Sequence, residues 1–275
     1  MSNLSKRIAT AAVLVPIVVG AIFFDPTAYA ILAISLVAVV LAGDEYLRMA
    51  LPVHEEDQAW GLRAVFAVAG MAMLLLSFVY GLGLAMPPVL TASAMAVCLA
   101  VLVRKRELAH AGRHMAVSLA GFLYVPMMAS VWPLLIQLEQ GSAWLTLALA
   151  TAFASDTLAY FFGRAWGRRK LYPEVSPKKT VMGAVGGLLG GVCGQVGLGS
   201  LLLLPEIPVA HALMLGVLGS VLGQLGDLVQ SMAKRTFGVK DSGNILPGHG
   251  GMLDRVDALL FVAPMVFYYA TIVFP

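Results

Sequence analysis

Nine apolar stretches of about 20 residues constrain the fold of this chain more than any other feature of its sequence. They cover 8–24, 27–43, 61–82, 86–103, 115–137, 142–163, 180–204, 208–230 and 255–274. A helix of about 20 apolar residues spans the hydrocarbon core of a bilayer, where the backbone must satisfy its own hydrogen bonds. Only 12% of the residues are charged, against about 25% in a typical soluble domain. We therefore predict an all-α, polytopic integral membrane bundle with about nine transmembrane helices.

The basic residues indicate how this bundle lies in the membrane. If the N-terminus is cytoplasmic, all 18 Lys and Arg residues fall in the N-terminal tail, in the even-numbered connections or at the ends of the stretches that border these connections. Cytoplasmic connections carry an excess of Lys and Arg, so we expect a cell (inner) membrane protein whose polar site faces the cytoplasm. A cleavable signal peptide is the alternative for the first stretch, but Asp25 and Pro26 favour a short turn between two spans.

The seventh apolar stretch carries two rows of glycine at helical spacing. The rows are Gly183, Gly187, Gly191 and Gly186, Gly190, Gly194. Small residues four positions apart let helices approach closely in lipid, so the rows predict tight helix packing. Bare backbone that lines a lipid or nucleotide cleft is compatible with this interpretation.

Most of the polar chemistry lies between residues 226 and 257. Asp227, Ser231 and Lys234 are spaced i, i+4 and i+7, which places them on one helix face. Five glycines and a proline follow between 236 and 251. These residues disfavour a helix and predict a loop that approaches a ligand closely.

Two carboxylates, Asp254 and Asp257, follow this loop at the start of the last apolar stretch. Carboxylates are favoured in the first turn of a helix, where free backbone N–H groups also attract phosphate. Acidic oxygens suit a hard cation, and the nearby Lys and Arg residues suit phosphate. The stretch therefore predicts a site for a metal ion and a nucleotide.

A second polar cluster begins inside the sixth apolar stretch. Asp156 lies within the span, where an unpaired carboxylate is costly, so it must face a partner, a cation or water. A structural ion pair with a basic residue is the alternative role. The cluster continues through Tyr160, Gly163 and Arg164 to Ser-Pro-Lys-Lys-Thr at 176–180.

The order G-D-L-x-x-S-x-x-K-R-x-x-G-x-K-D-x-G-x-x-x-P-G-H-G-G-x-x-D-R-x-D at 226–257 resembles the signature of phosphatidate cytidylyltransferases. The pattern D-x-x-A-Y-x-x-G-R followed by S-P-K-K-T is also typical of that family. The resemblance implies a membrane enzyme that joins CTP to phosphatidic acid with the help of Mg²⁺, giving CDP-diacylglycerol and pyrophosphate. It covers most of 150–257, so we expect a transmembrane scaffold at 1–140 and a catalytic half at 141–275.

The resemblance also implies roles for individual residues. Asp227 and Asp254 match the metal-binding carboxylates, and Asp257 is a further acid near the cation. Lys240 and Arg255 match catalytic basic positions, and His249 is either a proton donor or, as we favour, a lock for the loop. The expected substrate-binding residues are Asp156, Ser176, Lys178, Lys179, Ser231, Lys234, Arg235 and Asp241.

The chain departs from the family pattern at two places, which bear on its activity and specificity if their side chains contact the second metal or the cytidine. Gln230 stands where Glu is frequent, and Val181-Met182 stand where an aromatic residue and then Glu or Gln are frequent. A related CTP-using lipid enzyme, such as a polyprenol kinase or an archaeol-type cytidylyltransferase, and a membrane transporter remain alternatives. The loop at 247–251 and the one-sided cations favour phosphate handling. We expect CTP, phosphatidic acid and membrane lipid as partners, no nucleic acid, and leave a homodimer open.

Overall fold

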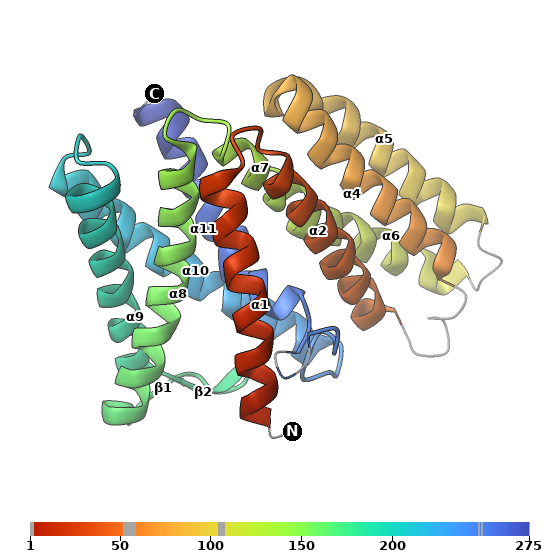
Figure 1. Cartoon of the computed structure of the whole chain (residues 1–275). Helices are drawn as coiled ribbons and strands as arrows, with labels where there is room; N and C mark the ends of the chain where they lie inside the picture. The colour runs from red at the N-terminus through yellow and green to blue at the C-terminus, as the bar shows by residue number, and fades with distance from the viewer. Residues whose placement is uncertain (1–2, 52–58, 104–107, 247, 249, 275) are drawn as a thin grey trace. The chain divides into compact units, whose positions relative to one another are not determined.

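The computed structural model of the chain describes residues 3–51, 59–103, 108–246, 248 and 250–274 (Figure 1). The described part is almost entirely helical. Its elements are α1 (Asn3–Phe24), α2 (Tyr29–Ala50), α4 (Trp60–Tyr80), α5 (Leu82–Val103), α6 (Leu108–Phe122), η1 (Leu123–Met127), α7 (Trp132–Leu135), α8 (Gly141–Trp166), β1 (Lys170–Tyr172), β2 (Ser176–Thr180), α9 (Val181–Gly194), η2 (Gln195–Leu203), α10 (Val209–Thr236), α11 (Leu253–Tyr268) and η3 (Tyr269–Val273), where η marks a π-helical segment.

Eight helical segments within the described ranges are long and apolar enough to cross a membrane. They are Tyr29–Ala50, Trp60–Tyr80, Leu82–Val103, Ala109–Leu135, Gly141–Trp166, Val181–Leu203, Val209–Thr236 and Leu253–Val273. The first predicted span is also helical, but its apolar part, Ala9–Phe24, is shorter than the others. The prediction of a polytopic helical bundle is confirmed, and the chain is an integral membrane protein.

The chain divides into two compact units. The first unit contains Met1–Leu134 and Val239–Arg255, and the second contains Leu135–Gly238 and Val256–Pro275. The polar stretch 226–257 is thus shared between the units. The division of roles at residue 140 stays a prediction.

Helices α2, α4, α5 and α6 form the body of the first unit (Figure 1). Leu47, Leu62 and Phe66 are almost fully buried in it. A Cβ atom at Gly43 would lie 2.6 Å from the Phe66 ring, so this glycine allows α4 to pack closely on α2. At the other end of α2, the Asp25 carboxylate accepts hydrogen bonds from the N–H groups of Thr27, at 2.9 Å, and Ala30, at 2.6 Å. This capping confirms the predicted turn before α2.

Helices α8, α9, α10 and most of α11 build the second unit, and glycines decide how closely they pack. A Cβ at Gly183 would lie 3.0 Å from the Ala159 carbonyl of α8, and one at Gly187 would lie 2.9 Å from the Gln224 amide of α10. Gly190 faces the Ala154 carbonyl of α8 even more closely. The predicted tight packing of both glycine rows is confirmed: the row of Gly186, Gly190 and Gly194 packs against α8, and the other row packs against α8 at Gly183 and against α10 at Gly187 and Gly191.

A short antiparallel hairpin of β1 and β2 joins α8 to α9, with Lys170 opposite Thr180 and Tyr172 opposite Ser176. Prolines at 173 and 177 disfavour a continuing helix here. Thr180 ends the hairpin and caps α9, because its Oγ1 accepts a hydrogen bond from the Gly183 N–H at 3.0 Å. The hairpin therefore holds Lys178 and Lys179 directly before α9.

Candidate active site

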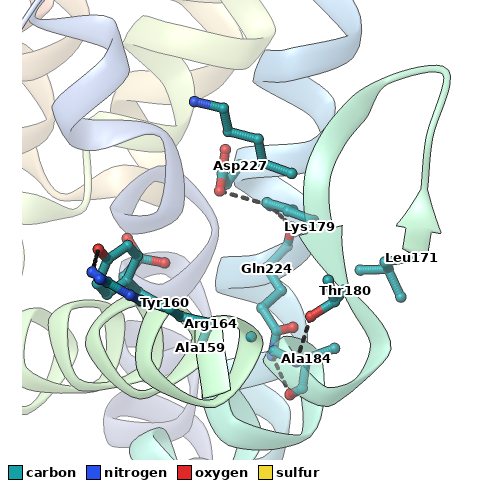
Figure 2. A pocket seen from close by; sticks show the side chains of 13 residues that line it. Ala159, Tyr160, Arg164, Leu171, Lys179, Thr180, Ala184, Gln224 and Asp227 are labelled. Carbon is teal, nitrogen blue, oxygen red and sulfur yellow. Dashed lines mark hydrogen bonds and ion pairs between the residues drawn. The ribbon is translucent and has the colours of Figure 1, made fainter. Parts of the chain in front are cut away.

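Lys179 and Asp227 form an ion pair in the second unit (Figure 2). The Lys179 Nζ is 2.6 Å from the Asp227 carboxylate and 3.5 Å from the Gln224 carbonyl oxygen. The Ser231 hydroxyl donates to the other Asp227 oxygen at 3.4 Å, which confirms that Asp227 and Ser231 share a helix face. Both charged side chains are partly exposed, so the pair is accessible to a ligand.

A cavity of about 370 Å³ opens beside this ion pair, at the end of α8, α9 and α10. Three cations and two carboxylates are among its lining residues, which include Asp156, Arg164, Lys178, Lys179 and Asp227. The Arg164 guanidinium donates to the Tyr160 hydroxyl at 3.0 Å (Figure 2). A cavity with excess positive charge at the end of apolar helices suits a phosphate group held at a membrane surface.

Tyr160 and Arg164 also line the cavity, although neither was among the predicted binding residues. Their spacing could have identified them, because Asp156, Tyr160 and Arg164 follow one another at intervals of four residues on α8. Residues at this spacing share a helix face. The predicted residues Asp156 and Lys178 lie in the cavity with them, and both are exposed.

Asp257 is buried on α11, with 8% of its surface exposed. Its carboxylate accepts a hydrogen bond from the Ala258 N–H at 2.7 Å. The charges of Asp227 and Asp156 repel this carboxylate, and Lys234 attracts it. Gly226 permits the close approach of α10, since a Cβ there would lie 2.6 Å from the Asp257 carbonyl oxygen. The second unit therefore gathers three carboxylates whose mutual repulsion a cation would relieve.

The donor chemistry of these carboxylates fits Mg²⁺. Among the described residues, no group of three or more His, Cys, Asp or Glu side chains could hold a metal ion. Mg²⁺ needs no such cage, because it is usually held by one or two carboxylates together with water and substrate phosphates. Asp227 and Asp257 can supply those oxygens. Asp254 belongs to the first unit, and its role in one metal site with them stays a prediction.

The first unit contains the glycine-rich loop between α10 and α11, and the predicted irregular backbone is confirmed. Gly248 and Gly250 have φ angles of 78° and 82°, which favour glycine. The Leu246 N–H donates to the Gly250 carbonyl at 3.0 Å, and the two residues form an isolated antiparallel bridge. His249 lies outside the described residues, so its role as donor or lock stays open.

Two carboxylates accept hydrogen bonds from this loop. The Asp254 Oδ2 accepts hydrogen bonds from the N–H groups of Ser242, at 2.9 Å, and Gly251, at 3.3 Å. Glu45 on α2 accepts three more, from the Ser242 hydroxyl and from the N–H groups of Met252 and Leu253. Glu45 was not among the predicted site residues, because the N-terminal half was expected to be scaffold.

The remaining predicted residues lie in the glycine-rich loop, at the start of α11, in the hairpin or at the end of α10. Lys240, Asp241 and Arg255 are exposed residues of the first unit, on or next to the loop. In the second unit, Ser176 begins β2 and is half-buried. Arg235 donates to the Val175 carbonyl at 3.4 Å and so ties the end of α10 to the hairpin.

Comparison with known proteins places these features in a family. The sequence matches the family described as "Cytidylyltransferase family" over residues 5–273. A phosphatidate cytidylyltransferase of Bacillus subtilis (strain 168) is 45% identical over 130 residues, which are 47% of this chain and 48% of the relative. One from Staphylococcus saprophyticus is 46% identical over 130 residues, covering 46% of this chain and 49% of the relative. The uncharacterized protein YnbB of Escherichia coli (strain K12) is 45% identical over 131 residues, covering 47% and 43%.

These matches cover about half the length of each curated relative. The family match, by contrast, extends over nearly the whole chain, from the first helix to the last. The chain therefore belongs to the cytidylyltransferase family.

Proposed function

We propose that the protein transfers the cytidylyl group of CTP to phosphatidic acid, giving CDP-diacylglycerol and pyrophosphate for phospholipid biosynthesis. The observation that carries the proposal is the cavity of the second unit, which Arg164, Lys178 and Lys179 line together with Asp227, the ion-pair partner of Lys179. The names of the Bacillus and Staphylococcus relatives support the same substrates.

The proposed reaction needs no nucleophilic side chain. A phosphate oxygen of phosphatidic acid, already ionised, attacks the α-phosphorus of CTP. The bond from that phosphorus to the bridging oxygen breaks, and pyrophosphate leaves with the electron pair. The protein has to align the two substrates and to neutralise charge on the phosphates. In phosphoryl transfer generally, this positioning and electrostatic stabilisation account for most of the rate enhancement.

Lys179 is the cation best placed for this work. Its ammonium already lies beside a carboxylate and within the cavity, and an incoming triphosphate would compete with Asp227 for it. Arg164 and Lys178 line the same cavity and would bind further phosphate oxygens. Negative charge builds up on the leaving pyrophosphate, and these cations would stabilise it more in the transition state than in the ground state.

We include Mg²⁺ in the proposal, with Asp227 and Asp257 as the residues that would hold it and Asp254 as a further candidate. The bound ion would supply Lewis-acid stabilisation of phosphate charge. In its absence, Lys179 and Lys234 offset part of the repulsion among the acids.

The lipid substrate would reach the cavity from the bilayer. Phe153 and Phe161 of α8 are exposed by 61% and 58% of their surface, and their helix is apolar enough to span the membrane. The acyl chains would stay in lipid beside this helix while the phosphate enters the cavity. From the positive-inside rule, we expect this end of the helix at the cytoplasmic face of the cell membrane, where CTP is available.

Isotope position tests this function against its rivals. The full chain is reconstituted in liposomes with phosphatidic acid and given CTP labelled at either the α- or the γ-phosphate. We expect label from the α-position in the lipid fraction, dependent on phosphatidic acid and Mg²⁺, and none from the γ-position. Transfer of γ-label to a lipid alcohol would indicate a kinase, and solute flux without any labelled lipid would indicate a transporter.

A further inference from the structure

Glu45 is a buried acid of α2 that binds the glycine-rich loop at Ser242 and at its end before α11. Only 2% of its surface is exposed. Its Oε1 accepts a hydrogen bond from the Met252 N–H at 2.9 Å, and its Oε2 accepts one from the Leu253 N–H at 2.9 Å. The Ser242 hydroxyl donates to Oε2 at 3.0 Å. Because Ser242 lies inside the loop and Met252 at its end, one carboxylate holds these two parts of the loop together.

Two glycines of the loop are explained by this carboxylate. A Cβ atom at Gly243 would lie 2.5 Å from Oε1 of Glu45, and one at Gly251 would lie 2.5 Å from Oε2. Neither glycine has a positive φ angle, in contrast to Gly248 and Gly250. Gly243 and Gly251 are therefore required for space rather than for backbone freedom. Glu45 occupies the space beside Gly243, and the Ser242 hydroxyl, which Glu45 binds, lies even closer than Glu45 to a Cβ at Gly251.

The carboxylate of Asp254 is fixed by the same backbone. Its Oδ2 accepts hydrogen bonds from the N–H groups of Ser242 and Gly251. Ser242 thus donates its hydroxyl to Glu45 and its N–H to Asp254. A shift of the loop away from Glu45 would remove donors from Asp254 and change its orientation.

The physical cost of losing Glu45 would fall on the start of α11. The first N–H groups of a helix have no partners within the helix, and those of Met252 and Leu253 are satisfied here by a residue from another helix. Leu253 is fully buried, so water does not readily replace the lost acceptor. Buried N–H groups without acceptors are costly, and the first turn would loosen.

We propose that Glu45 is a positioning residue for the active site: by holding Ser242 and the first turn of α11, it sets the orientation of the Asp254 carboxylate. This inference rests on the proposed function for the importance of Asp254 in turnover. The contact between Glu45 and the loop stands independently of it.

The test is Glu45→Gln in the full chain, with Asp44→Asn as the matched control. Asp44 is the neighbouring acid on α2, but it pairs with Arg48 and Arg63 instead of the loop. The amide that replaces the Glu45 carboxylate keeps one acceptor oxygen and turns its NH₂ group toward donors. We expect hydrogen–deuterium exchange at the Met252 and Leu253 amides to accelerate about tenfold or more, while Asp44→Asn leaves both rates unchanged.

Kinetics provide the second measurement. Glu45→Gln should lower kcat about ten- to hundredfold and raise the Mg²⁺ concentration for half-maximal rate, with little change in KM for CTP. Glu45→Asp, which restores the charge one methylene shorter, should recover part of the loss. A variant with a lower melting temperature but an unchanged Mg²⁺ dependence would overturn the positioning role.

Exchange and turnover separate the two hypotheses. Unchanged exchange at Met252 and Leu253 in Glu45→Gln overturns the inference even if the protein makes CDP-lipid. A wild-type protein that makes no CDP-lipid overturns the proposed function, while exchange still decides the contact. If Glu45→Gln does not fold, Ser242→Ala replaces it, because this variant removes one of the three donors to Glu45. Exchange at the Met252 and Leu253 amides should then accelerate, by less than is expected for Glu45→Gln. Exchange at the wild-type rate in Ser242→Ala would reject the inference.

Discussion

At the scale of single residues, ligand binding in the cavity of the second unit would depend on Lys179. A phosphate ligand would compete with Asp227 for its ammonium group. Lys179 stands at the end of β2 and Asp227 on α10, and their partly exposed ion pair is 2.6 Å long. Exposed ion pairs contribute little to stability. We infer that this pair serves binding more than folding.

Replacement of Lys179 by Met is expected to separate these roles. Loss of a charge-assisted contact to a phosphate removes roughly 1.5–3 kcal/mol, so kcat/KM for CTP should fall about ten- to hundredfold. The melting temperature in detergent should change little. Lys170→Met, in β1 of the same hairpin, is the control and should retain activity; an equal loss in both variants would show a general effect of charge.

Asp257 offers a different expectation, because it is buried among like charges. Asp257→Asn removes the repulsion with Asp227 and Asp156. We expect the variant to melt at a higher temperature than wild type when no Mg²⁺ is present, by about 2–4 °C for each kcal/mol gained, and to have almost no turnover. A variant that keeps wild-type turnover would remove Asp257 from the proposed metal site.

At the scale of elements, glycine decides how α9 lies against α8 and α10. The side of α9 with Gly183, Gly186 and Gly190 touches backbone carbonyls of α8, so no side chain can be added there without moving a helix. The loop before α11 uses glycine differently, since Gly248 and Gly250 supply positive φ angles. The same residue type therefore serves close packing in the helix and backbone geometry in the loop.

Gly190→Ala and Gly197→Ala form a matched pair that tests this packing. The Cβ at Gly190 would press on the Ala154 carbonyl, whereas nothing lies within 4 Å of a Cβ at Gly197 in η2. Overpacking costs about 1–3 kcal/mol, so Gly190→Ala should lower the melting temperature clearly. Gly197→Ala should leave it unchanged or raise it. Equal melting temperatures would contradict the close contact of α8 and α9.

At the scale of the whole molecule, the positive charges predict which end of each span faces the cytoplasm. α8 shows the consequence most simply, because its 26 residues make a helix about 39 Å long at 1.5 Å per residue. Such a helix reaches across the hydrocarbon core of a bilayer. Arg168 follows its C-terminal end and Glu139 precedes its N-terminal end.

Cysteine labelling tests this orientation. In a background with Cys98 and Cys193 replaced by Ala, Arg168→Cys should react with an impermeant maleimide only from the cytoplasmic side of sealed vesicles. Glu139→Cys should react only from the opposite side. Both positions are exposed, so each is chemically accessible. Labelling of both from one side would contradict the predicted topology.

The sequence by itself determined the features that arise from local spacing. Apolar length predicted the spans, four-residue glycine spacing predicted the packing of α9, and glycines with a proline predicted the irregular loop. The face shared by Asp227 and Ser231 followed from helical periodicity. These properties depend only on neighbours along the chain, and the structure confirms them. The assigned roles of the site residues stay predictions.

Only the tertiary structure decided which distant residues meet. Lys179 was one of several expected phosphate-binding residues, but its pairing with Asp227 depends on the hairpin that ends beside α10. Glu45 showed no pattern at all, because its three donors lie about 200 residues further along the chain. Such contacts follow from the packing of whole helices, since the free energy of a buried carboxylate depends on the donors that surround it and not on its sequence neighbours.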